Sequence, residues 1–156
     1  MEDFIINLAR KIAINSDLVQ KHGSILICDG QIISGYNHFT CSKNCITIHA
    51  EEDAIKNFIA FCRKKYYDDL YIRRKLRKAL LITIRVKNDI IKSSAPCRDC
   101  IELIKSYGIR QIIYSDIDIT DTTVLIKKKI RDIKNRPSSG YRWRERIPDN
   151  CKNIRL

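Results

Sequence analysis

The chain has 156 residues, of which 44% are hydrophobic, so it is long enough for one domain with a substantial core, and its composition argues against disorder. No apolar run approaches the roughly 20 residues of a membrane-spanning helix, and the amino-terminal segment has helical rather than signal-peptide spacing, so we expect a soluble, cytoplasmic protein without a membrane partner. The formal net charge is +12 at pH 7, which favours an anionic partner or substrate.

The positive charge is concentrated in two segments. Residues 62–87 hold ten Lys/Arg and two acids, and residues 127–156 hold eleven and three, whereas the rest of the chain holds nine and thirteen. Each basic segment can therefore face an anionic partner, and a nucleic acid is one such partner.

The first predicted elements are a helix and a hairpin. Residues 4–19 carry apolar side chains, up to Val19, at mostly helical spacing. The stretch 23–37 then has the pattern of two short strands around Asp29-Gly30, a dipeptide typical of a tight hairpin turn. We expect this hairpin at one edge of a sheet.

A second helix is predicted to begin near His49, after a loop. Glu52 and Asp53 in its first turn are interpreted as solvated acids that complement the helix dipole. Residues 62–78 contain neither Gly nor Pro, so the helix is expected to continue into a basic helical extension there. This extension interleaves tyrosines with basic residues, which fits a nucleic-acid surface or a solvated helix whose tyrosines pack on the body, and we favour the second.

The second half alternates strands and helices. Residues 79–86 predict a buried strand, a helix is predicted from near Pro96 to a C′ position at Gly108, and residues 109–115 predict another buried strand. Residues 121–133 fit strand and helix equally well. Such alternation indicates a three-layer α/β architecture with helices on the faces of a sheet, and the hairpin makes that sheet mixed.

Seven cysteines, an odd number without a secretion signal, indicate reduced thiols, some of which can bind metal. Pro96, Cys97 and Cys100 form a P-C-x-x-C motif at a helix start, where positions three apart share one face and the helix dipole favours thiolates. The same field at the start of the earlier helix is expected to keep His49 neutral, as a ligand must be. One His and two Cys leave a fourth position open, which describes a catalytic zinc site, and Glu51 is placed to hydrogen-bond the water there.

These motifs carry a family resemblance. The sequence HAE at 49–51, followed by PCRDC at 96–100, resembles the H-x-E…P-C-x-x-C signature of the zinc-dependent cytidine/deoxycytidylate deaminase superfamily. The order of elements over about residues 1–115 is similar as well. The resemblance implies an α/β/α three-layer sandwich, like that of cytidine deaminases, around a mixed five-stranded sheet.

The resemblance also assigns roles to individual residues. It makes His49, Cys97 and Cys100 the ligands of a Zn²⁺ cofactor and Glu51 the catalytic proton shuttle, which implies hydrolytic deamination through zinc-bound hydroxide. For Asn37, at the end of a strand, the alternative to a substrate contact is an ordinary turn residue. The substrate contacts that the resemblance implies are Asn37, Ala50 and Ala95.

The resemblance makes residues 1–156 a single deaminase domain with two departures from the compact family pattern. One is the extension at residues 62–78, which lengthens the chain between the two halves of the motif. The other is the basic tail at residues 135–156, which corresponds to nothing that the resemblance assigns.

Cys41 and Cys45 leave three alternatives open. With Cys97 and Cys100 they can complete a closed four-cysteine zinc site, which would leave the HAE motif unexplained. They can bind a second metal, with His38 as a further ligand. They can also be plain reduced thiols, which is the interpretation that we favour.

The leading functional hypothesis is deamination of the cytosine base of a free (deoxy)cytidine nucleotide, with dCMP to dUMP foremost. The GYN…HAE arrangement resembles that branch of the family, and a phosphate-bearing pyrimidine nucleotide accounts for part of the positive charge. The alternative is a polynucleotide deaminase acting on transfer RNA adenosine or single-stranded nucleic acid, bound through residues 62–87 and 127–156. A third reading, a zinc-stabilised binding module without catalysis, leaves Glu51 with little purpose. The resemblance also implies a homo-oligomer.

Overall fold

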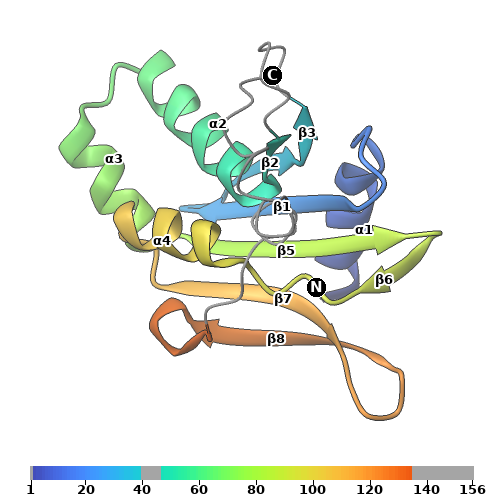
Figure 1. The fold of residues 1–156 in the computed structure, drawn as a ribbon. Coiled ribbons are helices and arrows are strands. Elements are labelled where there is room, and N and C mark those ends of the chain that lie inside the picture. The colour runs from blue at the N-terminus through green and yellow to red at the C-terminus, as the bar shows by residue number, and fades with distance from the viewer. Residues whose placement is uncertain (1, 40–46, 135–156) are drawn as a thin grey trace, which may run out of the picture.

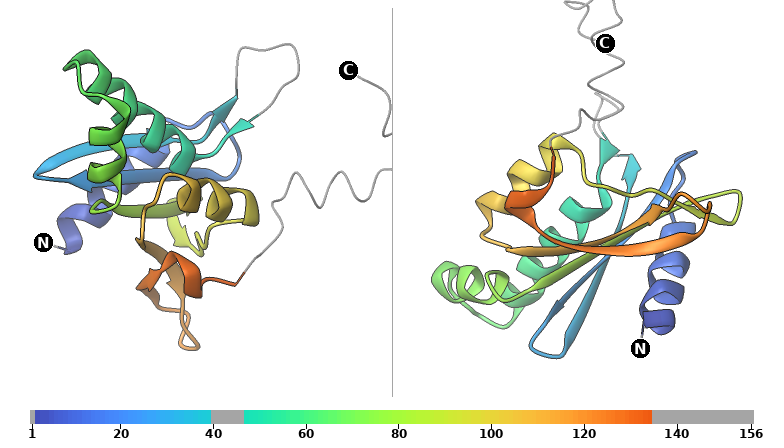
Figure 2. Two further views of the ribbon diagram at one scale, coloured as in Figure 1. Left: turned by 90° about the vertical axis from the view of Figure 1, so that its left-hand side faces the viewer. Right: turned by 90° about the horizontal axis from the view of Figure 1, so that it is seen from below.

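The structure, a computed structural model, describes residues 2–39 and 47–134. A sheet lies between two layers of helices (Figure 1). Helix α1 (Glu2–Ile14) covers one face, and the other face carries α2 (Ala50–Lys64), α3 (Asp69–Leu76) and α4 (Arg98–Ser106). Two further views show the same separation of α1 from the other helices (Figure 2). The predicted three-layer α/β/α sandwich is confirmed.

The sheet is mixed, as predicted, but has six strands rather than five. Its main path runs in the order β2-β1-β5-β7-β8, and the additional short strand β6 pairs with β5. Only the β5–β7 pairing is parallel. The strands are β1 (Lys21–Cys28), β2 (Gln31–Tyr36), β5 (Leu80–Lys87), β6 (Ile90–Lys92), β7 (Gln111–Ile117) and β8 (Thr123–Lys129). A separate two-stranded ladder joins β3 (His38–Phe39) to β4 (Thr47–Ile48).

The hairpin prediction is confirmed at its turn. Asp29 and Gly30 both have positive φ, 48° and 75°, as a type I′ turn requires. The flanking pair Cys28 and Gln31 closes the ladder between β1 and β2.

The first helix is shorter than the sequence pattern indicates. It ends at Ile14, and Val19, which continued the apolar spacing, lies outside it with 85% of its surface exposed. Ser16 is buried just beyond the helix end, and its Oγ accepts a hydrogen bond from the amide of Leu18 (3.2 Å). Local side-chain hydrogen bonding of this kind competes with the helix and favours a turn.

The expected continuation of the second helix through residues 62–78 is wrong. Helix α2 ends at Lys64, Tyr66 adopts a left-handed φ of 60°, and Asp68 caps α3 by accepting a hydrogen bond from the amide of Tyr71 (2.6 Å). Helix α3 then buries Ile72 against the body. The favoured interpretation is thus correct in placing a helix on the body but wrong about the tyrosines: Ile72 and Leu76 make the contact, whereas Tyr66 and Tyr67 are exposed.

The undecided segment 121–133 is an edge strand followed by a 3₁₀ turn (Ile130–Asp132). Strand β8 carries a run of exposed lysines, Lys127, Lys128 and Lys129, and charged side chains of this kind keep an edge strand from pairing with other chains. The basic tail at 135–156 lies outside the described residues. Within the part that is described, no helix is long and apolar enough to cross a membrane.

Candidate metal centre

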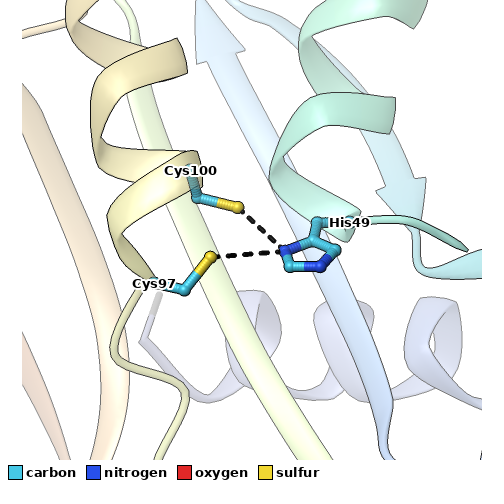
Figure 3. Close-up of side chains that lie close together, drawn as sticks. All are labelled: His49, Cys97 and Cys100. Atoms are coloured by element: carbon cyan, nitrogen blue, oxygen red, sulfur yellow. Dashed lines mark hydrogen bonds between the residues drawn. The ribbon is translucent and has the colours of Figure 1, made fainter. Parts of the chain in front are cut away.

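Two helix starts bring the predicted metal ligands together. His49 is the N-cap residue of α2, and Cys97 is the N-cap residue of α4, with Cys100 in the first turn of the same helix. Both helices lie on one face of the sheet, and their N-termini meet, so that the imidazole faces the two sulfurs (Figure 3). Residues 48 positions apart in the chain thus converge at one point.

The distances suit a tetrahedral metal. His49 Nδ1 lies 3.1 Å from Cys100 Sγ and 3.6 Å from Cys97 Sγ. Zinc bonds of about 2.3 Å to sulfur and about 2.0–2.1 Å to nitrogen, at tetrahedral angles, would separate these atoms by about 3.6 Å. The donor set of one imidazole and two thiols is also the one that zinc prefers. Within residues 2–39 and 47–134, no other group of three or more His, Cys, Asp or Glu side chains is so close.

The predicted proton shuttle is adjacent to this cluster. Glu51 lies in the first turn of α2 and is only 4% exposed. Burial is the main cause that raises the pKa of its carboxyl, while the charge of His49 opposes the shift, and the side chain hydrogen-bonds Cys100. Burial of a carboxyl is costly, and perturbed pKa values of this kind cluster at functional sites, so the catalytic role of Glu51 stays a prediction that its placement is compatible with.

The three side chains shift one another's pKa values. A hydrogen bond with Cys97 is the main cause that raises the pKa of His49 to about 9, and burial opposes the shift. A hydrogen bond with Cys100 is the main cause that lowers the pKa of Cys97 to about 4, and the same interaction raises that of Cys100. Metal binding by these side chains has to displace the protons that they share.

The position of α2 over the sheet depends on contacts that the sequence did not reveal. Asp53, interpreted above as a solvated acid, accepts a hydrogen bond through Oδ2 from the amide of Tyr36 in β2 (3.0 Å). Gly35 lies against α2, where a Cβ would approach Ala54 Cα to 2.7 Å and the carbonyl of Ala50 to 2.8 Å. The glycine thus allows the helix that carries His49 and Glu51 to sit directly on β2. Glu52 ion-pairs with Lys56 one turn later (2.6 Å).

A buried serine cluster holds the segment that precedes Cys97. Ser94 Oγ donates to the carbonyl of Thr83 (2.7 Å) and accepts from the amide of Ser115 (2.9 Å), so it joins β5 and β7 to the start of α4. Sequence reasoning missed this residue, because a serine before a P-C-x-x-C motif looks like an ordinary loop residue.

The residues predicted to contact the substrate lie near the cluster, and their role stays a prediction. Asn37 is buried; its Oδ1 accepts from the amide of His22 (2.7 Å), and its Nδ2 donates to the carbonyl of Gln20 (2.7 Å). An amide side chain offers two donors and two acceptor positions, so one of each is left for a ligand. Ala50 is buried at the start of α2, and Ala95 packs against the core beside α4.

The alternatives that involve Cys41 and Cys45 fall outside the described residues. Of the cysteines that the structure describes, Cys28 and Cys62 are buried in the core, where desolvation is the main cause that raises the pKa of each thiol. These two behave as small apolar residues rather than as ligands.

The fold and the cluster agree with comparisons to known proteins. Three solved structures, all cytidine deaminases, resemble the chain: that from Burkholderia pseudomallei (TM-score 0.59, 13% identity, 88% of this chain and 99% of that one), that from Mycobacterium leprae (0.54, 16%, 86% and 98%) and that from Mycobacterium tuberculosis (0.53, 14%, 84% and 91%). At these identities the likeness shows the fold alone. No curated protein has a significantly similar sequence.

The family itself is shown by sequence. The model of the cytidine and deoxycytidylate deaminase zinc-binding region matches residues 3–116, well over half of the chain, and that span contains His49, Cys97 and Cys100. The chain therefore belongs to the family of zinc-dependent cytidine and deoxycytidylate deaminases.

Proposed function

We propose that the protein deaminates the cytosine base of a free (deoxy)cytidine nucleotide, with dCMP and its product dUMP as the leading pair. The observation that carries the proposal is the convergence of His49, Cys97 and Cys100 beside the buried carboxyl of Glu51. The solved structures with the same fold are cytidine deaminases, which supports cytosine as the base. We assign the three converging residues as ligands of zinc, with the fourth position of the tetrahedron left open.

Zinc held there supplies Lewis acidity, which lowers the pKa of a water molecule to about 7. The residues of the chain do the remaining work. Glu51 takes a proton from the attacking water and passes it to ring nitrogen N3, while the water oxygen bonds to C4. When the tetrahedral carbon collapses, the C4–N4 bond breaks, and a second proton delivered through Glu51 lets the amine leave as ammonia. Burial raises the pKa of Glu51, which suits a group that must both accept and donate a proton.

A polynucleotide substrate is the second candidate, because one observation favours it. A groove of about 700 Å³ between α2 and α3 is lined by basic side chains, among them Arg63, Lys64 and Arg73. This groove lies along the C-terminal half of α2, from Lys56 to Lys64, about 10 to 22 Å along the helix from His49. It is thus separate from the candidate metal centre, and a strand that reaches both would have to follow α2.

A screen for ammonia release tests these alternatives. Zinc-loaded protein is assayed with dCMP, CMP, dCTP, cytidine, cytosine and transfer RNA at matched salt. The proposal expects the fastest turnover with dCMP and a shallow dependence on salt, whereas a polynucleotide deaminase would lose affinity steeply as salt rises, because each neutralised phosphate releases counterions. A protein that holds zinc and releases no ammonia from any of these compounds would overturn the proposal in favour of a binding module. The predicted homo-oligomer is checked separately by light scattering.

A further inference from the structure

Three basic side chains form a row across three neighbouring strands. His22 of β1 lies directly opposite Arg85 of β5, and Arg85 lies directly opposite Lys92 of β6. These strands lie side by side in the sheet (Figure 1). Opposed residues of antiparallel strands project from the same face with their Cβ atoms about 4.5–5.5 Å apart, and like charges in such positions repel. Arg85 and Lys92 therefore repel each other unless an anion neutralises them, whereas His22, whose pKa burial lowers to about 4, is a neutral neighbour at pH 7.

The row lies on the same face of the sheet as the candidate metal centre. Along β5, Ile82 and Ile84 pack toward α1, whereas Leu81 packs toward α2 and α4. Because side chains alternate along a strand, Arg85 shares the face of Leu81. Thr83 lies between them on that face, and its backbone carbonyl accepts a hydrogen bond from Ser94, just before α4. Arg85 lies two residues beyond Thr83 along β5, about 7 Å away.

Electrostatic contacts also join the row to the centre. Burial is the main cause that lowers the pKa of His22, and the positive charges of Arg85 and His49 lower it further. The amide of Asn37, the predicted substrate contact, donates to the carbonyl of His22 (3.2 Å), so Asn37 extends the row on its other side. Asn37 follows Tyr36, whose amide donates to Asp53 in the first turn of α2, and Ser94 just before α4 donates to the carbonyl of Thr83, so the row lies beside the segments that lead to both helix starts.

Arg85 has no partner of its own. Its Nε is buried without a hydrogen bond, and within residues 2–39 and 47–134 its guanidinium forms no hydrogen bond or ion pair. Asp116 of β7 does not neutralise the row: it forms no ion pair in the described part of the chain, and its Oδ1 accepts from the amide of Ile117 (3.0 Å). A buried guanidinium nitrogen without a hydrogen bond costs stability, so its retention points to a ligand that completes it.

We infer that His22, Arg85 and Lys92 form an anion subsite that binds the 5′-phosphate of the nucleotide whose base is deaminated. The inference rests on the proposed function and adds to it the residues that hold the phosphate. The planar guanidinium of Arg85 matches a phosphate in charge and in hydrogen-bond geometry, Lys92 adds a point charge, and His22 contributes a polar edge.

The kinetic test compares a phosphorylated substrate with its unphosphorylated counterpart. The zinc-loaded full chain is assayed with dCMP and with deoxycytidine, for the wild type and for Arg85→Met. We expect the KM for dCMP to rise about 10- to 100-fold, with deoxycytidine constants unchanged within about twofold, since only the phosphate contact is lost. Arg85→Lys keeps the positive charge but loses the planar guanidinium, so its KM for dCMP should lie between those of the wild type and Arg85→Met. Arg110→Met, at an exposed arginine beside the opposite end of β5, is the matched control and should change neither substrate.

A thermal-shift measurement separates a binding role from a structural one. Inorganic phosphate and dCMP should raise the Tm of the wild type but not that of Arg85→Met, whose Tm without ligand should equal or exceed that of the wild type, because an unsatisfied buried group is removed. A lower Tm without ligand, together with equal losses for dCMP and deoxycytidine, would overturn the subsite and make Arg85 structural.

The remaining outcomes distinguish failure of the proposed function from failure of the anion subsite. If no compound is deaminated but stabilisation by phosphate or dCMP depends on Arg85, the proposed function fails and the subsite stands. If neither anion stabilises the wild type and the KM for dCMP does not depend on Arg85, the subsite is wrong. If Arg85→Met weakens binding of a single-stranded oligonucleotide but not of dCMP, a polymer substrate replaces the monophosphate.

Discussion

The contact between β2 and α2 offers a sharp test of how the fold positions the site. Gly35 faces the first turns of α2, where a Cβ would lie 2.7 Å from Ala54 Cα, and it would approach the amide nitrogen of Ala54 even more closely. Ordinary carbon–carbon contacts are about 3.5–4.0 Å, so Gly35→Ala must move α2 by about 1 Å. Because the opposing atoms are backbone, no rotamer change can relieve the clash.

The expected loss has two components. Forcing an extra methyl into a filled contact costs about 1–3 kcal/mol of the free energy of unfolding. In addition, α2 carries His49 and Glu51 at its start, and a displacement of about 1 Å at reacting groups can lower the rate about 100-fold. Gly35→Ala should therefore reduce kcat/KM for dCMP far more than its stability loss alone would.

Gly23→Ala is the matched control on the other face of the sheet. Its Cβ would lie 2.7 Å from the amide nitrogen of Ala13 in α1, a comparable clash with a helix that holds none of the proposed ligands. We expect urea unfolding to show similar losses for the two variants, and zinc content and kcat/KM of the folded protein to fall only in Gly35→Ala. Equal activity in the two variants at equal stability would refute the claim that the placement of α2 governs the site.

Four further predictions follow from single contacts. Glu51→Gln should lower kcat about 10²- to 10⁴-fold while zinc content, measured by atomic absorption, is unchanged; near-normal turnover would contradict the shuttle. Burial lowers the pKa of His22 from 6.5 to about 4, so the unfolded chain binds the proton before the folded protein does as pH falls. The free energy of unfolding should therefore be highest above pH 6.5 and fall by about 3 kcal/mol by pH 4. Urea unfolding of His22→Gln should lack this fall. Ser94→Ala should cost about 1–3 kcal/mol in the same assay, because it leaves buried partners unsatisfied, whereas Ser106→Ala at an exposed helix end should cost less than about 0.5 kcal/mol. Cys45→Ser should keep zinc at the main centre, and loss of that metal would favour the four-cysteine site.

Those parts of the fold that depend on local chemistry were predictable from the sequence. Asp29-Gly30 tolerates the two positive φ angles of a type I′ turn, and Gly108, with a φ of 80°, ends α4 at the predicted C′ position. The buried strands β5 and β7 are short apolar runs that burial alone selects. The two motifs HAE and P-C-x-x-C together predicted that His49, Cys97 and Cys100 lie in one cluster.

The features that escaped prediction depend on tertiary contacts. The break between α2 and α3 has neither Gly nor Pro; Tyr66 accepts a left-handed φ there because Ile72 gains burial when α3 turns back onto the body. Asp53 looks like a solvated first-turn acid until β2 supplies the amide of Tyr36. Arg85 lies within an apolar strand, and only the cross-strand register shows that it opposes two other basic residues.

The placement of the proposed ligands at helix starts explains a weakness in the fold. N-cap positions usually hold Ser, Thr, Asp or Asn, whose side chains accept hydrogen bonds from the first amides and stabilise a helix by about 1 kcal/mol. His49 and Cys97 hold these positions in α2 and α4 without any capping hydrogen bond, so both helix starts lack that stabilisation. The same positions aim the side chains at each other and set the Cys97 thiolate in the positive field of a helix end. Local stability is thus sacrificed at the two points where the geometry of a metal centre is created, and a bound metal that joins them would restore part of it.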